Sequence, residues 1–193
     1  EDNQGNIWIG AFHTGLMVIP KSMYGFETVA LRSQKQGVAD IACVTSIESD
    51  LTGNRLWIGT DGSGLYLVDG NGGNRRYTNK NCGLSNNSIM SVKTDKRGKI
   101  WVATYLGGLF CGTAESGFRQ FKDQKELKSE QIYCLAYSEE DDIIYIGTHG
   151  NGMSVISPSE EKVIRTFADD DNKWISNLYI DKSGLVWIGT YNG

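Results

Sequence analysis

Proline is scarce in this chain of 193 residues, which contains 2 prolines and 24 glycines. Disordered linkers are usually enriched in proline and serine as well as glycine, so this composition does not favour a linker. Many glycines with few prolines instead indicate tight turns between short strands. No apolar run approaches the length of about 18 residues typical of a transmembrane helix, so we expect no membrane-spanning segment here.

An excess of one charge is also missing. The chain has 19 Lys and Arg residues against 23 Asp and Glu residues, a net charge of −4 at pH 7. Proteins that bind nucleic acid usually carry a basic patch or stripe, and none is visible, so a nucleic-acid partner is not expected. Nucleophile elbows, HExxH motifs, phosphate loops and dinucleotide fingerprints are absent too. We therefore predict no catalytic residue and no cofactor.

Metal-binding patterns are equally sparse. The four cysteines show no CxxC spacing and accompany no histidine cluster, which disfavours both a zinc site and a disulfide framework. They are Cys43, Cys82, Cys111 and Cys134. We expect them to be small apolar residues inside strands, with Cys82 in a loop. The 2 histidines belong to repeats that are not neighbours, so no metal site is predicted.

What the chain does contain is one pattern that recurs along its whole length. LWIGTDGSGLYLVD at 56–69 has related copies at 7–20, 100–113 and 144–157, and a further copy begins at residue 186. Its aromatic markers are Trp8, Trp57, Trp101, Tyr145 and Trp187, which are separated by 49, 44, 44 and 42 residues. A steady period in the forties that contains only strand-like segments is typical of β-propeller blades.

Each full repeat divides into four strands, so we predict an all-β propeller of four-stranded antiparallel blades. About four and a half blades are expected, at residues 1–30 (partial), 40–80, 86–122, 130–168 and 174–193 (partial). The first partial blade supplies the second to fourth strands of a repeat and the last supplies the first two. We expect these blades to belong to a larger, seven-bladed type of propeller, and the chain alone to expose apolar faces and self-associate.

The second strand of each repeat is apolar on both faces, as in Leu56-Trp57-Ile58. A strand of this kind is buried on both sides, because each blade packs between two neighbours. The five aromatic markers are therefore predicted to form the core between blades. Turns of the form Asp-x-x-Gly, at residues 2–5, 95–98 and 181–184, precede this strand and favour tight hairpins.

The tips between the second and third strands vary within this uniform scaffold, and the connections between blades reach the same face. Varied side chains at one edge of a repeated scaffold are candidates for recognition. Aromatic, imidazole and amide groups suit polyhydroxylated ligands, through ring stacking and hydrogen bonds. The predicted ligand-binding candidates are His13, Asp61, Tyr105, His149, Trp174, Tyr191 and Asn192.

The repeated segments, taken together, resemble the two-component regulator propeller repeat. That repeat consists of a strand, D-x-x-G, L/I-W-I-G-T, a glycine-rich turn ending in G-L, and an aromatic-containing outer strand. Residues 181–193 and 56–65 match this pattern best, and the resemblance covers essentially the whole chain. Ala103 in place of Gly, Tyr145 in place of Trp and Ala11 in place of Thr depart from it.

Proteins similar to this family are the extracytoplasmic sensor regions of hybrid two-component systems in Bacteroides-type bacteria. The resemblance implies a periplasmic module that is not itself catalytic and that senses an oligosaccharide. It also implies contact with the rest of the sensor protein and a homodimer as partners.

Two other functions remain open. A streptogramin-lyase-like propeller enzyme uses rim His and Glu residues as acid and base. His13 and His149 fit that pattern, but no Glu lies at a matching tip. Alternatively, the blades are purely structural and serve only to pack and dimerise, with the ligand bound elsewhere.

Overall fold

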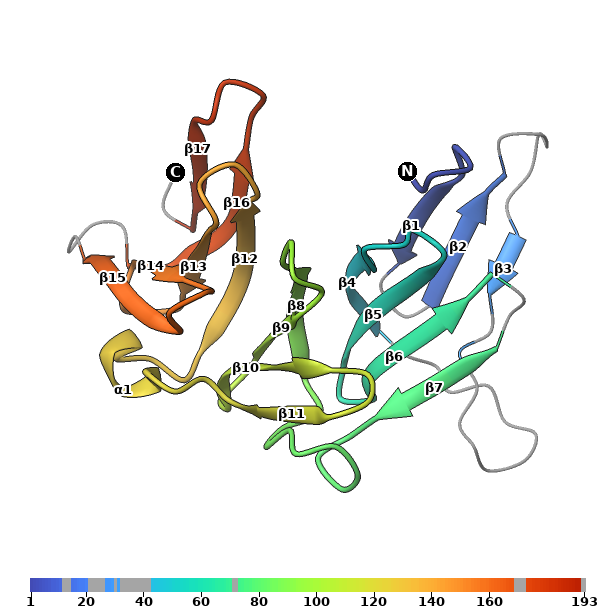
Figure 1. Ribbon diagram of the computed structural model, residues 1–193, viewed down its shortest axis with the longest axis horizontal. Coiled ribbons are helices and arrows are strands. Elements are labelled where there is room, and N and C mark those ends of the chain that lie inside the picture. Colours follow the sequence, from blue (N-terminus) through green and yellow to red (C-terminus); the bar gives the residue numbers. More distant parts are fainter. Residues whose placement is uncertain are drawn as a thin grey trace. The chain divides into compact units, whose positions relative to one another are not determined.

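The strands of the repeat form antiparallel sheets, shown in Figure 1. The computed structural model describes residues 1–11, 15–20, 27–29, 31, 43–70, 73–168 and 173–191. Within these residues the regular structure is almost entirely β-strand, with one short helix. The all-β prediction is confirmed.

Three sheets in the described residues have four strands each, in the up-and-down order of propeller blades. The first contains β4 (Cys43–Ser49), β5 (Arg55–Asp61), β6 (Gly64–Asp69) and β7 (Asn74–Tyr77). The second contains β8 (Ile89–Thr94), β9 (Ile100–Thr104), β10 (Gly108–Thr113) and β11 (Gly117–Gln120). The third contains β12 (Ile132–Ser138), β13 (Ile143–Thr148), β14 (Met153–Ser157) and β15 (Lys162–Phe167).

Two smaller sheets lie at the ends of the chain. The first contains β1 (Ile7–Ala11), β2 (Gly15–Ile19) and β3 (Glu27–Val29), and the last contains β16 (Ile175–Ile180) and β17 (Val186–Thr190). They match the second to fourth strands of one repeat and the first two strands of another. The prediction of four-stranded antiparallel β-propeller blades is confirmed, and the two smaller sheets are consistent with partial blades.

The chain divides into two compact units, residues 1–92 and 93–193, with the boundary inside β8. The repeat pattern did not indicate this division, because the same pattern continues on both sides of the boundary. Each unit has an apolar core of its own between neighbouring sheets.

In the first unit, β4 contacts both β1 and β2, so the sheet β1–β3 packs on the sheet β4–β7. The buried residues at this junction are Leu16, Leu31, Val44, Leu56, Ile58, Tyr66 and Val68. Apolar side chains from both faces of β5 are buried, which explains why its sequence does not alternate with polar residues.

The second unit repeats this arrangement. One cluster includes Trp101 and Leu109 from the sheet β8–β11 and Phe121, which follows β11, together with Ile144 and Ile146 from β13. A second cluster joins the sheet β12–β15 to β16 and β17, because β16 contacts both β12 and β13. Blade-on-blade packing therefore supplies the core, as the apolar second strands predicted.

The aromatic markers differ in burial. Trp57 and Trp101 are buried, whereas Trp8 and Tyr145 are half-buried and pack against the clusters of their own units. Trp187 is 60% exposed, in contrast to its predicted place in a core between blades. The reason is that the described residues include no sheet that covers this face of β17.

The loop between the second and third four-stranded sheets, at residues 122–131, contains the helix α1 (Gln124–Leu127). The loop is not fully exposed, because Leu127 is completely buried in the cluster around Trp101. No helix in the described part of the chain is long and apolar enough to span a membrane.

The Asp-x-x-Gly turns do more than reverse the chain. The Oδ1 atom of Asp95 accepts hydrogen bonds from the backbone N–H groups of Arg97 and Lys99. Its Oδ2 atom accepts a hydrogen bond from the indole Nε1 of Trp101 at 3.0 Å. The pairs Asp2–Trp8 and Asp181–Trp187 repeat this indole bond at 2.8 Å. The aspartate thus ties each turn to the aromatic marker of the following strand.

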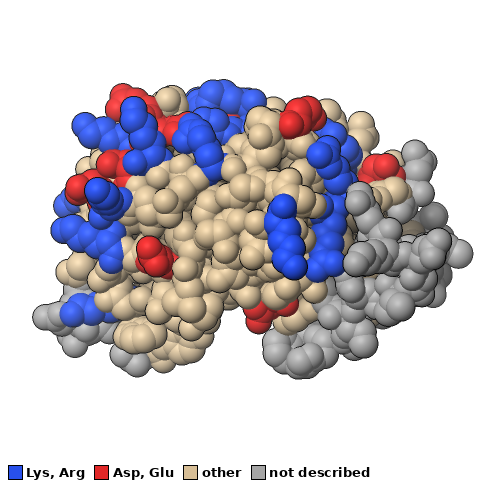
Figure 2. Space-filling view, turned by 90° about the horizontal axis from the view of Figure 1, so that it is seen from below, with Lys and Arg blue, Asp and Glu red and all other residues tan. Residues whose placement is uncertain are grey.

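Charged side chains of both signs are mixed on the surface, as Figure 2 shows for one face. In the second unit, Arg97 bonds both carboxylate oxygens of Asp142, at 2.7 and 2.9 Å. The carboxylate of Glu161 accepts hydrogen bonds from Lys99 and from Arg119. These ion pairs link the sheet β8–β11 to the sheet β12–β15 near the surface.

Candidate functional site

The hairpins between the second and third strands are held by a repeated hydrogen bond. A buried threonine at the end of the second strand donates its hydroxyl to the carbonyl of the glycine that begins or precedes the third strand. The bonds run from Thr60 to Gly64, from Thr104 to Gly108 and from Thr148 to Gly152, at 2.5, 2.8 and 2.8 Å. This explains the threonine of the W-I-G-T pattern and makes the hairpin tips a uniform platform for varied side chains.

Five rings from three sheets of the second unit meet at this platform. We call Tyr105, Tyr133, His149, Trp174 and Tyr191 the aromatic cluster. The Tyr133 ring stacks on the His149 imidazole, with centroids 3.4 Å apart and planes 15° apart. Trp174 and Tyr191 contact the same imidazole at centroid distances of 5.1 and 5.0 Å. Tyr105 meets Tyr133 edge-on at 6.1 Å.

Main-chain hydrogen bonds hold the loops that carry these rings. The His149 N–H donates to the Gln131 carbonyl at 3.0 Å, and the Tyr191 N–H donates to the Trp174 carbonyl at 3.1 Å. His149 and Trp174 also form an isolated antiparallel bridge between the third sheet and the last. The backbone therefore fixes the position of His149 between neighbouring sheets.

A bulge in β12 determines the place of Tyr133. The pairing of β12 with β13 shifts register between Ile132 and Cys134, which leaves Tyr133 as the extra residue. β-Bulges redirect a side chain relative to the sheet. Here the redirected side chain is the one that stacks on His149.

His149 is half-buried, and burial lowers the pKa of its imidazole. The neutral ring is therefore favoured at neutral pH. Its Nε2 atom is buried and has no hydrogen-bond partner among the described residues. The contacts of the ring are aromatic, which distinguishes this histidine from a general base oriented by a carboxylate.

The outer rings of the cluster are accessible. Trp174 and Tyr191 are 48% and 62% exposed, and Tyr105 is 36% exposed. Aromatic faces that are fixed at one edge and open to solvent can stack on an apolar face of a ligand. The described part of the chain contains no group of three or more His, Cys, Asp or Glu residues arranged to hold a metal ion.

The structure brings four of the seven predicted candidates together, namely Tyr105, His149, Trp174 and Tyr191. Asp61 is exposed at the end of β5 in the first unit and is not part of these ring contacts. His13 and Asn192 lie outside the described residues. Ligand binding by any of the seven stays a prediction.

Tyr133 is not among the candidates predicted from the sequence. The bulge depends on pairing with β13 and has no local sequence pattern. The shared bulge position in other blades, Thr45 and Ser176, carries small hydroxyl residues instead of a ring.

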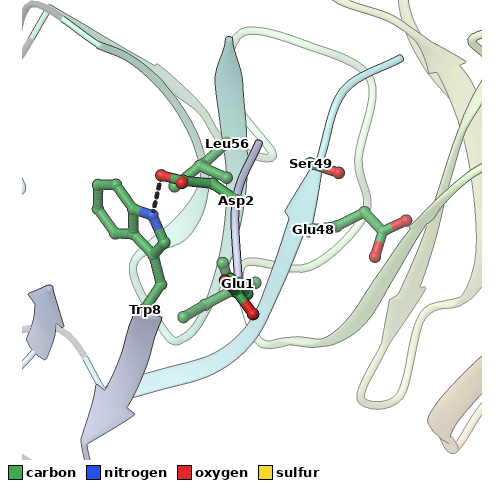
Figure 3. A pocket seen from close by; sticks show the side chains of 7 residues that line it. Glu1, Asp2, Trp8, Glu48, Ser49 and Leu56 are labelled. Carbon is green, nitrogen blue, oxygen red and sulfur yellow. Dashed lines mark hydrogen bonds between the residues drawn. The ribbon is translucent and has the colours of Figure 1, made fainter. Parts of the chain in front are cut away.

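A pocket of about 250 Å³ lies in the first unit and is lined by none of the residues of the aromatic cluster. Figure 3 shows Asp2 bonded to the indole of Trp8 at its wall, with Glu48, Ser49 and Leu56 nearby. The hydrogen bonds from Trp8, Asn6 and the backbone outweigh burial and lower the pKa of Asp2 to about 2. This carboxylate is therefore engaged in the turn.

Two segments of the chain, residues 83–106 and 164–192, match the model of the two component regulator propeller family. A comparison with curated proteins finds no match. The second matched segment contains Trp174 and Tyr191 of the aromatic cluster, and the first contains Tyr105.

Solved structures share the fold. The extracellular domain of BT3049 from B. thetaiotaomicron, named as a hybrid two component system, has a TM-score of 0.81 at 21% identity, over 97% of this chain and 25% of that chain. The extracellular domain of BT4673 from the same organism, named as a one component system, has a TM-score of 0.70 at 20% identity, over 96% and 30%. The Cps50 (Swd1) β-propeller domain of Myceliophteria thermophila has a TM-score of 0.64 at 11% identity, over 96% and 65%.

At these identities the structural likeness concerns the fold alone. This chain spans about a quarter of the length of the BT3049 domain. The two matched segments contain the Asp-x-x-Gly turns at 95–98 and 181–184 and the second strands that carry Trp101 and Trp187. Two segments of the chain therefore match the two component regulator propeller model, and the chain is folded as β-propeller blades.

Proposed function

We propose that this chain is part of the extracytoplasmic, periplasmic sensor region of a two-component signalling protein, and that its aromatic cluster binds an uncharged oligosaccharide. The family match and the fold support a sensor region. The proposal for the ligand rests on one observation, which is the meeting of five rings from three sheets at one platform.

The chemistry of the cluster suits a carbohydrate. Sugar rings present apolar C–H faces beside hydroxyl groups, and exposed aromatic rings such as those of Trp174 and Tyr191 can pack against these faces. A neutral imidazole and the tyrosine hydroxyls can exchange hydrogen bonds with the sugar hydroxyls. The aromatic contacts of His149 provide no fixed charge for pairing with an ionic ligand.

The position of the cluster also suits signalling. Its rings come from the sheets β8–β11, β12–β15 and β16–β17, so a ligand that contacts several rings would touch several blades at once. Binding would stabilise the packing between these blades, and the rest of the sensor protein or a second copy in a homodimer would receive the change.

Calorimetric titration tests this proposal. The full chain is titrated with a panel of uncharged oligosaccharides of four to eight units, built from xylose, mannose, glucose or arabinose. We expect at least one member to bind, and W174A and Y191A to weaken that binding by tenfold or more, as for the loss of a stacked ring.

Tyr179→Ala is the matched control for Tyr191→Ala. Tyr179 lies in β16 and is 63% exposed, against 62% for Tyr191, but it belongs to none of the cluster's ring contacts. Its loss should leave the affinity unchanged. A panel in which no sugar binds, or binding that survives both cluster substitutions, would contradict the proposed site.

A further inference from the structure

His149 occupies the centre of the aromatic cluster, but its imidazole is poorly placed to serve as a stacking platform. Tyr133 already covers one face of the ring, at 3.4 Å. Trp174 and Tyr191 approach the same ring at angles of 57° and 77°. Stacking with a ligand therefore belongs to the exposed outer rings, and His149 has a different role.

The distinctive feature of His149 is its Nε2 atom, which is buried without a hydrogen-bond partner among the described residues. Buried polar atoms are nearly always paired, because leaving one unpaired destabilises the fold. An exception at the centre of an otherwise ordered cluster needs an explanation. A hydrogen-bonding group supplied by a ligand would explain it.

The neighbouring Tyr133 is also unlike its counterparts. At the same bulge in other sheets, the Thr45 hydroxyl donates to the Ile89 carbonyl and the Ser176 hydroxyl donates to the Gly189 carbonyl, at 3.1 Å for Ser176. Those two small side chains hold the main chain. Tyr133 instead directs a ring onto the imidazole, so this bulge orients His149.

We propose that His149 is the specificity-determining hydrogen-bond partner of the site and that Tyr133 is its positioning residue. The Nε2 atom exchanges a hydrogen bond with a hydroxyl group of an uncharged ligand, while Trp174 and Tyr191 contact the ligand's apolar face. Trp174 and Tyr191 contact the imidazole and are themselves exposed, so the proposed hydrogen bond requires one of these rings to move aside for the ligand to reach the nitrogen. This inference rests on the proposed function.

The chemistry of imidazole favours a hydroxyl over a charged group. In neutral imidazole Nε2 either donates or accepts a hydrogen bond, depending on the tautomer. A hydroxyl can do both and matches either tautomer, whereas an ammonium only donates and a carboxylate only accepts. Burial, which lowers the pKa of His149, supports the neutral form. An ionic ligand would also lose hydration beside the aromatic rings.

The substitution H149F separates this role from a structural one. Phenylalanine retains a ring that can stack on Tyr133 and removes the unpaired nitrogen, so thermal stability should be unchanged or higher. The affinity for the oligosaccharide that the wild-type chain binds should nevertheless fall about tenfold, the usual scale for one hydrogen bond. If His149 served only the fold, H149F would lower the thermal stability and leave the affinity unchanged.

Two substitutions test Tyr133. Y133S introduces the side chain found at Ser176 and should weaken binding by a factor similar to that of H149F, whereas Y133F, which keeps the stacked ring, should recover most of that loss. In the wild-type chain, the ¹⁵N resonance of His149 Nε2 should shift when the oligosaccharide is added. In Y133S this shift should be smaller.

The outcomes distinguish the two proposals. If W174A and Y191A abolish binding while H149F and Y133S retain wild-type affinity, the proposed function stands and the role of His149 is wrong. If no oligosaccharide binds, or if all four variants bind like the wild type, the proposed function fails and this inference fails with it. Loss of affinity in H149F together with an unstable fold would also contradict the assignment.

Discussion

At the scale of single residues, the histidine in the aromatic cluster combines two unfavourable features: it is half-buried and its Nε2 atom is unpaired. Such features concentrate at functional sites, where a residue is retained for recognition at some cost in stability. The aspartates of the turns show the opposite behaviour. Hydrogen bonds from Ser183 and Trp187 lower the pKa of Asp181 to about 2, so the charged form stabilises its turn.

The buried imidazole predicts a dependence of stability on pH. The folded-state pKa of His149 is lowered by burial, below the value of about 6.5 expected in the unfolded chain. As the pH falls through this value, the unfolded chain takes up more protons, so the free energy of unfolding decreases.

Urea unfolding at pH 7.5 and pH 5.5 measures this effect. The loss of stability between the two pH values should be larger for the wild-type chain than for H149F, which has no group to titrate at this position. Equal losses in the two proteins would show that His149 does not contribute.

At the scale of elements, the turn and the second strand of each blade act as one unit. The carboxylate of Asp95 is completely buried and accepts bonds from two backbone N–H groups and from the Trp101 indole. In the turn at residues 50–53, Asp50 bonds the side chain of Arg55 at 2.8 Å. Trp57 follows Asp50 by one residue more than the aromatic marker follows the aspartate in the other copies. With this spacing, the Asp50 carboxylate bonds the side chain of Arg55.

Asp95→Ala should therefore destabilise the fold by about 2–3 kcal/mol, because it leaves a buried indole N–H and turn amides without their acceptor. Thermal and urea unfolding measure the change. Asp181→Ala is the matched control, since the same turn there is exposed and water can replace the carboxylate. If D181A lost as much free energy of unfolding as D95A, burial would not be the reason why Asp95 stabilises the fold.

At the scale of the whole molecule, packing between blades decides which sheet faces are buried. An added Cβ atom at Gly147 would lie 2.6 Å from the side chain of Ile175 in the next sheet, whereas at Gly189 the nearest atom is 3.4 Å away. The same strand position is thus closely covered in one blade and open in another. Trp187 and Tyr179 pair across β17 and β16 on the open sheet and are 60% and 63% exposed.

We expect the 193-residue chain to self-associate through this exposed aromatic face, because a second copy would bury apolar surface that water now contacts. Sedimentation velocity over a range of concentrations should show a dimer or larger species. Trp187→Lys should shift the equilibrium towards the monomer, whereas Lys162→Ala, on the edge strand β15, should not. A monomer at all concentrations would contradict this prediction.

The sequence by itself determined the repeat, the four-stranded blades and the apolar second strands. Strand alternation, Asp-x-x-Gly turns and the positions of aromatic markers depend on neighbouring residues and are therefore visible in a single chain. The same local pattern placed Tyr105, His149, Trp174 and Tyr191 at one edge of the blades. Tertiary structure decided which rings touch, because contacts between sheets join residues that are separated by a whole repeat.

Three further features required the tertiary structure. The bulge that places Tyr133 on His149 arises from the register between β12 and β13, and no local pattern encodes it. The burial of Leu127 and the exposure of Trp187 depend on whether another sheet covers their side chains. Trp101 and Trp187, which have the same role in the repeat, thus differ in environment, because burial is a property of packed surfaces and not of a sequence motif.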